Sequence, residues 1–218
     1  MDSRPVIIGI AGGTGSGKTS VALKIKSFFP YERVEILHHD AYYYDNSRLP
    51  AEERAHINYD HPSAFETELL LEHLDRISRG EEIVQPRYDY ETHTRLADGL
   101  PVGRSDIILL EGILVLDDEE LRRRMDIRVY IDADSDERFI RRLVRDLKSR
   151  ERTVNSIIGQ YQETVRPMHL RFVEPSKRYA DIIVPEGAHN EVAIDLLVVK
   201  IRDILSRRQA ALDEGGSA

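Results

Sequence analysis

The sequence predicts an α/β fold in which helices flank a buried sheet of parallel strands, and three observations support this prediction. Five short apolar runs recur along the chain, stretches with helical periodicity separate them, and a glycine-rich segment directly follows the first run. Runs that are apolar throughout are typical of strands covered on both faces, as in parallel sheets. In doubly wound folds of this kind, ligands bind beyond the carboxyl ends of the strands.

The predicted elements alternate along most of the chain. We expect strands in the apolar runs VIIGI (6–10), VEIL (34–37), DIILL (106–110), IRVYI (127–131) and DIIV (181–184). Apolar residues at helical spacing predict helices over 20–29, 64–79, 136–150 and 191–207. In the first of these helices we expect Val21, Leu23, Ile25 and Phe28 to be buried.

One segment interrupts the alternation. Residues 82–102 mix short extended runs with proline, glycine and aromatic residues, which predicts a hairpin-like insertion outside the main sheet. We expect one domain over 1–208 and a disordered tail over 209–218, because the end of the chain is rich in small and polar residues.

The glycine-rich segment has the spacing of a phosphate-binding P-loop, with Gly12, Gly17, Lys18 and Thr19 at its fixed positions. Such a loop points backbone N–H groups at phosphate oxygens, its lysine reaches the β- and γ-phosphates, and its threonine binds Mg²⁺. A flexible turn between strand and helix is the alternative, but the flanking strand and helix favour a nucleotide site. The predicted nucleotide-binding residues here are Gly12, Gly13, Thr14, Gly15, Ser16, Gly17, Lys18, Thr19 and Ser20.

Composition excludes several classes of protein. The 218 residues include no cysteine, so disulfides, thiolate metal sites and cysteine nucleophiles are excluded. The formal net charge of −8 argues against broad binding to nucleic acid or to an anionic membrane. We find no membrane-spanning run and no leader segment, and therefore expect a cytoplasmic protein. The basic residues between Arg138 and Arg152 form either a solvated helix face or a phosphate clamp.

Acidic residues follow two predicted strands. Asp40 lies near the carboxyl end of the second strand, where a carboxylate could accept the proton of an alcohol or bind Mg²⁺, although it could also cap the next segment. Glu111 ends the third strand, where P-loop proteins place an acid that orders metal-bound water. His38 and His39 are adjacent on a strand, so their side chains point to opposite faces and cannot readily share one metal ion.

Two polar and aromatic clusters could recognise a second substrate. They are NYDHPSAF, from Asn58, and PRYDYETHTR, from Pro86. Tyrosine rings stack on flat rings, whereas Asp, His and Arg pair with hydroxyl and carbonyl groups, so the two clusters together suit a nucleoside. Turns with packed aromatic residues are the alternative for each cluster.

These motifs, in this order, resemble the uridine kinase (uridine-cytidine kinase) family of the bacterial type. The resemblance extends from the P-loop to about Ile204 and rests on GGTGSGKTS, HDAYYYD, EERAHINYDHPSAF, YETHTR, LLEGIL, QYQETVRPMHLRFVEPSKRYADIIVP and VAIDLL. It implies a three-layer P-loop fold with a five-stranded parallel sheet, a β-hairpin over the nucleoside, a mobile helical lid over about 138–160, and a homo-tetramer.

The resemblance also implies roles for individual residues. Asp40 and Lys18 would be catalytic, and Thr19, Asp40 and Glu111 would form the Mg²⁺ environment. The implied substrate-binding residues are Tyr59 and Tyr90 as aromatic walls, Asp60 at the ribose, Tyr88 and His93 at the base, and Arg142, Arg152 and Gln160. Four arginines would lie on the helix and lid that close over the phosphates, namely Arg142, Arg145, Arg150 and Arg152, and of these Arg145 and Arg150 are assigned to the nucleotide. The sequence departs from the family pattern at Glu151, where glycine is usual, and at Glu186 and His189, near the expected donor base.

The implied activity is transfer of the γ-phosphate of ATP or GTP to the 5′-hydroxyl of uridine or cytidine, giving UMP or CMP in pyrimidine salvage. A GTPase-like switch is one alternative, but the sequence lacks the N-K-x-D guanine motif and a D-x-x-G after the third strand. A kinase for another alcohol, such as ribulose phosphate or pantothenate, is the other alternative, which the cluster around Tyr88 and His93 disfavours.

Overall fold

A five-stranded parallel sheet forms the centre of the protein. The computed structural model describes residues 4–149 and 152–215. Within them the sheet has the strand order β2-β5-β1-β6-β7, and its strands are β1 (Val6–Gly12), β2 (Val34–His38), β5 (Ile107–Glu111), β6 (Ile127–Asp132) and β7 (Ile182–Pro185). All five predicted strands are therefore confirmed, each within a few residues of its expected bounds.

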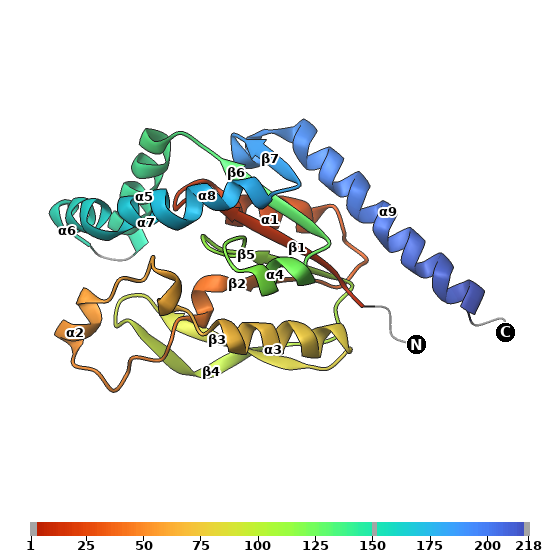
Figure 1. The fold of residues 1–218 in the computed structure, drawn as a ribbon, viewed down its shortest axis with the longest axis horizontal. Coiled ribbons are helices and arrows are strands. Elements are labelled where there is room, and N and C mark those ends of the chain that lie inside the picture. Colours follow the sequence, from red (N-terminus) through yellow and green to blue (C-terminus); the bar gives the residue numbers. More distant parts are fainter. Residues whose placement is uncertain (1–3, 150–151, 216–218) are drawn as a thin grey trace.

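Helices cover both faces of the sheet, as the side chains of β1 show, which point alternately to one face and to the other. Val6, Ile8 and Ile10 pack into one apolar cluster with residues of α1 (Lys18–Ser27) and α9 (Glu191–Gly215). Ile7 and Ala11 point to the opposite face and pack with residues of α3 (Thr67–Ser78) and α4 (Glu119–Arg124). Both faces are thus buried, which explains why the strands are apolar throughout. Figure 1 shows α9 and α3 on opposite sides of the strands.

The first predicted helix exists, but the prediction that Leu23 is buried is wrong. Val21, Ala22, Ile25 and Phe29 are buried, whereas the Leu23 side chain is 56% exposed. Successive helical residues turn by about 100°, so the buried residues share one face and Leu23 lies on the other.

The insertion is a separate two-stranded antiparallel sheet of β3 (Ile83–Asp89) and β4 (Thr94–Val102), as predicted. A register shift between Pro86 and Tyr88 marks a bulge in it. The hairpin lies beside α3 and near α2 (Ala51–His56) (Figure 1). Its Ile83 and Val102 are buried and anchor it to the main core.

The predicted lid region contains α5 (Ser135–Ser149) and α6 (Val154–Gln160), which lie at one end of the molecule, whereas α9 ends at the other (Figure 1). Beyond α6 the chain stays helical, in a run that the sequence analysis did not predict: a π-helical segment (Tyr161–Val165), α7 (Arg166–Met168), a second π-helical segment (His169–Val173), α8 (Glu174–Ser176) and a 3₁₀ turn (Lys177–Tyr179). Pro167 and Pro175 lack the N–H that a regular helix needs, and wider turns accommodate such gaps.

Short 3₁₀ turns complete the fold at His39–Tyr42, Pro62–Ala64 and Gly187–His189. The last helix, α9, continues to Gly215, so 209–215 are helical and not part of a disordered tail. Gln209, Ala210 and Ala211 are good helix formers, which explains the extension. Arg150, Glu151 and the last three residues of the predicted tail lie outside the described residues. Among the described helices, none is both long and apolar enough to cross a membrane.

Aspartates secure the amino ends of the strands. Asp126, directly before β6, accepts a hydrogen bond from the Ile7 N–H of β1 at 2.9 Å and pairs with Arg4 at 2.7 Å and Arg208 at 2.6 Å. Asp106 and Asp181 are placed in the same way before β5 and β7. These contacts hold neighbouring strands together at their amino ends, and the P-loop lies at the opposite, carboxyl end of the sheet.

Candidate active site

The P-loop connects β1 to α1, and its backbone requires glycine. Gly15 has φ 74° and Gly17 has φ 95°, in the left-handed region that side chains disfavour. A Cβ on Gly15 would also lie 2.2 Å from the carbonyl oxygen of Arg138. The loop is therefore held closely against α5, and α1 begins directly after it, so the N–H groups of that helix end face the loop.

Lys18 is folded back over this loop. Its Nζ donates to the Gly13 carbonyl oxygen at 3.1 Å. Burial lowers the pKa of Lys18, and the nearby charges of Glu111 and Asp40 oppose that shift. The ammonium group is thus largely removed from water beside two acids, where it can act strongly on a phosphate.

Glu111 links α1 to β2. Thr19 Oγ1 donates to Glu111 Oε1 at 3.1 Å, and His38 Nδ1 lies 2.7 Å from the same oxygen. Burial tends to raise the pKa of Glu111, but the hydrogen bond from His38 and the charge of Lys18 outweigh it and lower that pKa. The same hydrogen bond raises the pKa of His38. Glu111 is therefore a carboxylate, and His38 is a partner that the sequence analysis missed.

The two adjacent histidines have different partners, and only His38 lies on the strand, because β2 ends there and His39 begins a 3₁₀ turn. The His39 ring stacks on Phe65 with 4.0 Å between centroids, and burial lowers its pKa to about 3. His38 instead points to Glu111 because the two residues are in register between β2 and β5. That register was the available signal for the contact.

Thr19, Asp40 and Glu111 supply hydroxyl and carboxylate oxygens, which are the ligands that Mg²⁺ prefers. Thr19 and Glu111 are already in contact, and Asp40 is close enough to influence Lys18 and His38 electrostatically. Within 4–149 and 152–215, no group of three or more His, Cys, Asp or Glu is arranged to hold a metal ion. The set fits an ion that takes only a few protein ligands and completes its shell with phosphate oxygens and water.

A single pocket brings together residues from the P-loop, the hairpin and the lid. It is lined by Thr14, Asp40, Tyr43, Tyr59, Asp60, Tyr90, His93, Ile113, Arg142, Arg145, Arg152 and Gln160. Most of the residues predicted for substrate binding are in this set. Tyr43 and Ile113 were missed, although Tyr43 lies in the run of three tyrosines that begins two residues after Asp40, which was a usable signal.

Aromatic rings form one wall of the pocket. His93 stacks on Tyr59 with 4.7 Å between centroids and 9° between the ring planes, and Tyr43 meets Tyr59 edge-on at 5.1 Å. Tyr88 does not line the pocket: it is 8% exposed and packs behind the wall against Tyr43 and Tyr90. The structure therefore places Tyr88 as support for the rings that face the pocket.

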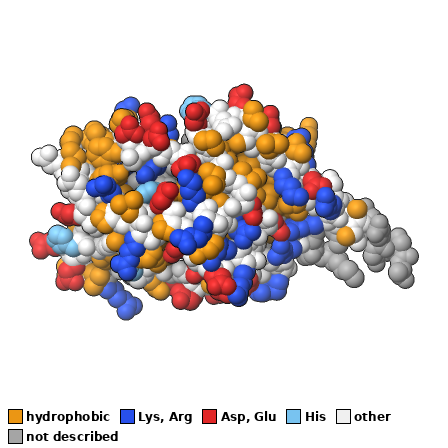
Figure 2. Space-filling model, turned by 45° about the horizontal axis from the view of Figure 1, so that its top comes forward, with side chains coloured by type: hydrophobic (Ala, Val, Ile, Leu, Met, Phe, Trp, Pro, Cys, Tyr) orange, Lys and Arg blue, Asp and Glu red, His pale blue; other side chains and the backbone are white. Residues whose placement is uncertain are grey.

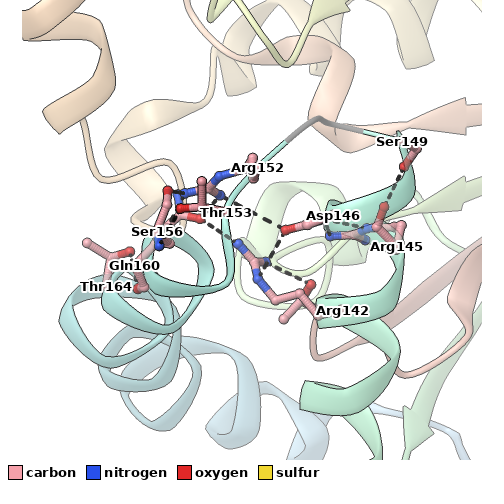
Figure 3. A network of polar contacts seen from close by, with 10 residues as sticks. Arg142, Arg145, Asp146, Ser149, Arg152, Thr153, Ser156, Gln160 and Thr164 are labelled. Carbon is pink, nitrogen blue, oxygen red and sulfur yellow. Dashed lines mark hydrogen bonds and ion pairs between the residues drawn. The ribbon is translucent and has the colours of Figure 1, made fainter.

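Three arginines, Arg142, Arg145 and Arg152, also line the pocket. Arg142, on α5, donates to Thr14 Oγ1 at 3.0 Å. It also donates to Gln160 Oε1 at 2.7 Å (Figure 3). Arg152 donates to the same Gln160 oxygen. Arg142 thereby connects the lid helices to the P-loop.

A buried pair behind the P-loop was also missed. Arg138 Nη2 lies 3.1 Å from His169 Nε2, and its Nε donates to the Ala133 carbonyl oxygen at 3.0 Å. Burial and the charge of Arg138 lower the pKa of His169 to about 4, so the ring is neutral and accepts from the guanidinium group. A Cβ on Gly13 would lie 2.5 Å from Arg138 Nη1, so this pair supports the back of the loop.

The surface charge is mixed. On the face shown in Figure 2, acidic, basic and apolar side chains are interspersed. The positive charge that could bind a polyanion is instead concentrated locally, in the pocket between the P-loop and the lid.

Comparison with known proteins identifies the family. The sequence profile of the Phosphoribulokinase / Uridine kinase family matches residues 7–193. The chain belongs to this family. It is 57% identical over 208 residues to the uridine kinase of Geobacillus sp. (strain WCH70), covering 95% of this chain and 99% of that protein. It is 50% identical over 209 residues to the uridine kinase of Clostridium tetani (strain Massachusetts / E88), covering 96% and 100%.

Solved structures support the P-loop kinase fold. A kinase assigned to fructose transport in Silicibacter sp. TM1040 superposes with a TM-score of 0.70 at 19% identity, covering 84% of this chain and 91% of that one. D-glycerate 3-kinase from Cryptococcus neoformans superposes with a TM-score of 0.58 at 17% identity, covering 80% of each chain. These likenesses concern the fold alone.

Proposed function

We propose that the protein is a uridine kinase that transfers the γ-phosphate of ATP or GTP to the 5′-hydroxyl of uridine or cytidine. The observation that carries this proposal is one pocket bounded by Thr14 of the P-loop, by Asp40, by aromatic rings and by arginines. Such a pocket can hold a phosphate donor and a flat-ringed alcohol together. Relatives that are 50% and 57% identical over nearly the whole chain are named uridine kinases, which supports the same acceptor.

The proposed reaction is an in-line phosphoryl transfer. The 5′-oxygen forms a bond to the γ-phosphorus, the bond to the bridging oxygen of the donor breaks, and a nucleoside diphosphate leaves. Asp40 accepts the proton of the attacking hydroxyl, and Lys18 stabilises charge on the phosphoryl oxygens. Mg²⁺, when bound by Thr19, Asp40 and Glu111, would neutralise charge on the donor phosphates.

The acceptor would be recognised on two sides. Asp60 lines the pocket and is proposed to accept hydrogen bonds from the ribose hydroxyls. Tyr59 and Tyr90 would flank the pyrimidine, and His93 would hydrogen-bond its edge after leaving the stack on Tyr59. Tyr88 would act from behind this wall, supporting Tyr90 and Tyr43.

The phosphate side would involve the lid. Arg142, Arg145 and Arg152 line the pocket and are proposed to close over the transferred group, with Arg150 as a fourth member. A resident Mg²⁺ requirement, a homo-tetramer, a cytoplasmic location and a role in pyrimidine salvage complete the proposal. The tetramer follows from the family resemblance.

A kinetic comparison of acceptors tests the proposal. The purified protein is given uridine, cytidine, adenosine, ribulose 5-phosphate and pantothenate in turn, each with ATP and with GTP. We expect uridine and cytidine to have the highest kcat/KM, because the aromatic wall suits one flat ring. A higher kcat/KM for ribulose 5-phosphate or pantothenate would contradict the proposal and favour another branch of the family.

A further inference from the structure

The lid contains a buried acid that none of the roles above uses. Asp146, on the inner face of α5, has a fully buried side chain. Arg145 Nε and Nη2 each lie 2.8 Å from Asp146 Oδ1. Arg142 Nε lies 3.5 Å from Oδ2, and Arg152 Nη1 lies 4.0 Å from the same oxygen. One carboxylate is therefore surrounded by three guanidinium groups (Figure 3).

All three of these arginines line the pocket. They come from different parts of the lid: Arg142 and Arg145 from α5, and Arg152 from the segment between α5 and α6. The backbone N–H of Arg152 also donates to the Asp146 carbonyl oxygen at 3.4 Å, which brings the chain back to α5. Asp146 thus connects the two segments of the lid through both its side chain and its backbone.

The charges explain why an acid is needed at this point. Three guanidinium groups close together repel one another, and the repulsion is strong where burial excludes water. The Arg142 side chain is only 7% exposed, so it has little solvent to screen it. A single carboxylate offsets part of this repulsion and leaves the cluster with net positive charge. Such a cluster remains suited to a phosphoryl group and is ordered before that group arrives.

A second set of contacts connects the arginines of the lid to the P-loop. Gln160 Oε1 accepts from both Arg142 and Arg152, and Arg142 also donates to Thr14 Oγ1 at 3.0 Å. A shift of the Arg142 guanidinium would therefore disturb both the lid and the loop.

We infer that Asp146 is a positioning residue that preassembles Arg142, Arg145 and Arg152 around the transferred phosphoryl group. The inference rests on the proposed function for the identity of that group. It assigns Asp146 a role in turnover through the arginines, without contact to either substrate.

The test replaces Asp146 with asparagine, which keeps the shape of the side chain and removes its charge. Because misplacement by about 1 Å can cost about a hundredfold in rate, we expect kcat to fall by about 10- to 100-fold. Affinity for the donor, measured by calorimetry with ADP and with a non-hydrolysable ATP analogue, should change by less than about threefold, because the order matters in the transition state. Turnover within about twofold of the parent, or an equal loss of donor affinity, would overturn the inference.

Asp126→Asn is the matched control. Asp126 also pairs with two arginines but lies at the amino end of the sheet. The Asp126→Asn substitution should lower the melting temperature of the protein and leave kcat unchanged. The Asp146→Asn substitution should instead lower kcat at a temperature at which circular dichroism shows that the variant is folded. If both variants lose turnover only in proportion to their unfolded fraction, Asp146 is merely structural and the inference fails.

A second variant covers the case in which Asp146→Asn does not fold. Arg145 is 42% exposed, so Arg145→Lys should fold, yet lysine cannot present two N–H groups to Asp146 in the same geometry. Its kcat should also fall more than its donor affinity, and a loss confined to donor affinity would overturn the inference. Since donor binding needs no acceptor, a parent that binds ADP but does not phosphorylate uridine would refute the proposed function separately.

Discussion

The two ends of the parallel sheet use the same residue types for different purposes. At the amino end, Asp106 and Asp181 each accept hydrogen bonds from both the backbone N–H and the guanidinium group of one arginine. These arginines are Arg33, directly before β2, and Arg128, in β6. At the carboxyl end, acids and arginines from several elements face one pocket.

The difference lies in what the charges face. An aspartate directly before a strand is within reach of the next strand's N–H, so its hydrogen bonds are local and fix the register of the sheet. At the carboxyl end the strands lead into loops, and the charged groups of those loops converge on a shared space. Changes at the amino end should therefore affect stability, and changes at the carboxyl end should affect turnover.

The largest effect is expected at Asp40. Asp40→Asn removes the proton acceptor while keeping the shape of the side chain, so turnover should fall by at least about a hundredfold. Folding and donor binding should remain, as measured by circular dichroism and calorimetry. A purified variant with near-normal turnover would remove Asp40 from the catalytic role.

Two substitutions in the pocket should change the kinetics with uridine and cytidine in different ways. Asp60→Ala removes a charge-assisted hydrogen bond worth about 1.5–3 kcal/mol, so kcat/KM should fall to a similar extent for uridine and cytidine. His93→Ala should instead change the ratio of the two, because that contact concerns the base. The measurement is kcat/KM for uridine, cytidine and adenosine in all three proteins. An unchanged ratio and unchanged rates in His93→Ala, or equal use of adenosine by the parent, would contradict the pyrimidine pocket.

At the amino end, Asp126→Asn should lower the free energy of unfolding by about 1–3 kcal/mol, because it weakens hydrogen bonds to Ile7 N–H, Arg4 and Arg208. Urea denaturation measures the loss, and kcat should stay within about twofold of the parent. A large loss of turnover with unchanged stability would contradict the claim that the amino end of the sheet affects stability and the carboxyl end affects turnover.

The smallest effect concerns His39, which adjoins the site but points away from it. Its pKa is about 3 in the folded protein and 6.5 as a free side chain, so between these values only the unfolded chain binds the proton. Stability is therefore lost as pH falls below about 6.5, by about 1.4 kcal/mol at about pH 5.5. Urea denaturation at about pH 7.5 and pH 5.5 should show a smaller pH-dependent loss in His39→Gln than in the parent. An identical loss in both proteins would contradict the assignment.

Sequence alone predicted the strands and the P-loop because both have short-range signals. Apolar runs are local, and the spacing of Gly12, Gly17 and Lys18 is fixed by the chemistry of phosphate binding. The family resemblance added predictions for residues without such local signals, such as Asp60 and His93, which both line the one pocket.

The helix α5 was predicted, but the side that it turns inward was not, because its buried face carries charged residues and its exposed face carries apolar ones. Arg138, Arg142 and Asp146 are buried, whereas Ile140, Val144 and Leu147 are 54%, 45% and 41% exposed. Helical periodicity alone would place the apolar residues inside. The charged residues are inside because they bind one another and the P-loop, and such partners are visible only in three dimensions.

The central claim is that the carboxyl end of the sheet transfers the γ-phosphate to the nucleoside and does not release it to water. The most direct test incubates the purified protein with Mg²⁺ and ATP or GTP, with and without uridine, and quantifies UMP and nucleoside diphosphate. We predict about one UMP per nucleoside diphosphate when uridine is present, and little diphosphate without it. Diphosphate formed at the same rate without uridine, and no UMP with it, would contradict the claim and identify a nucleotide hydrolase instead.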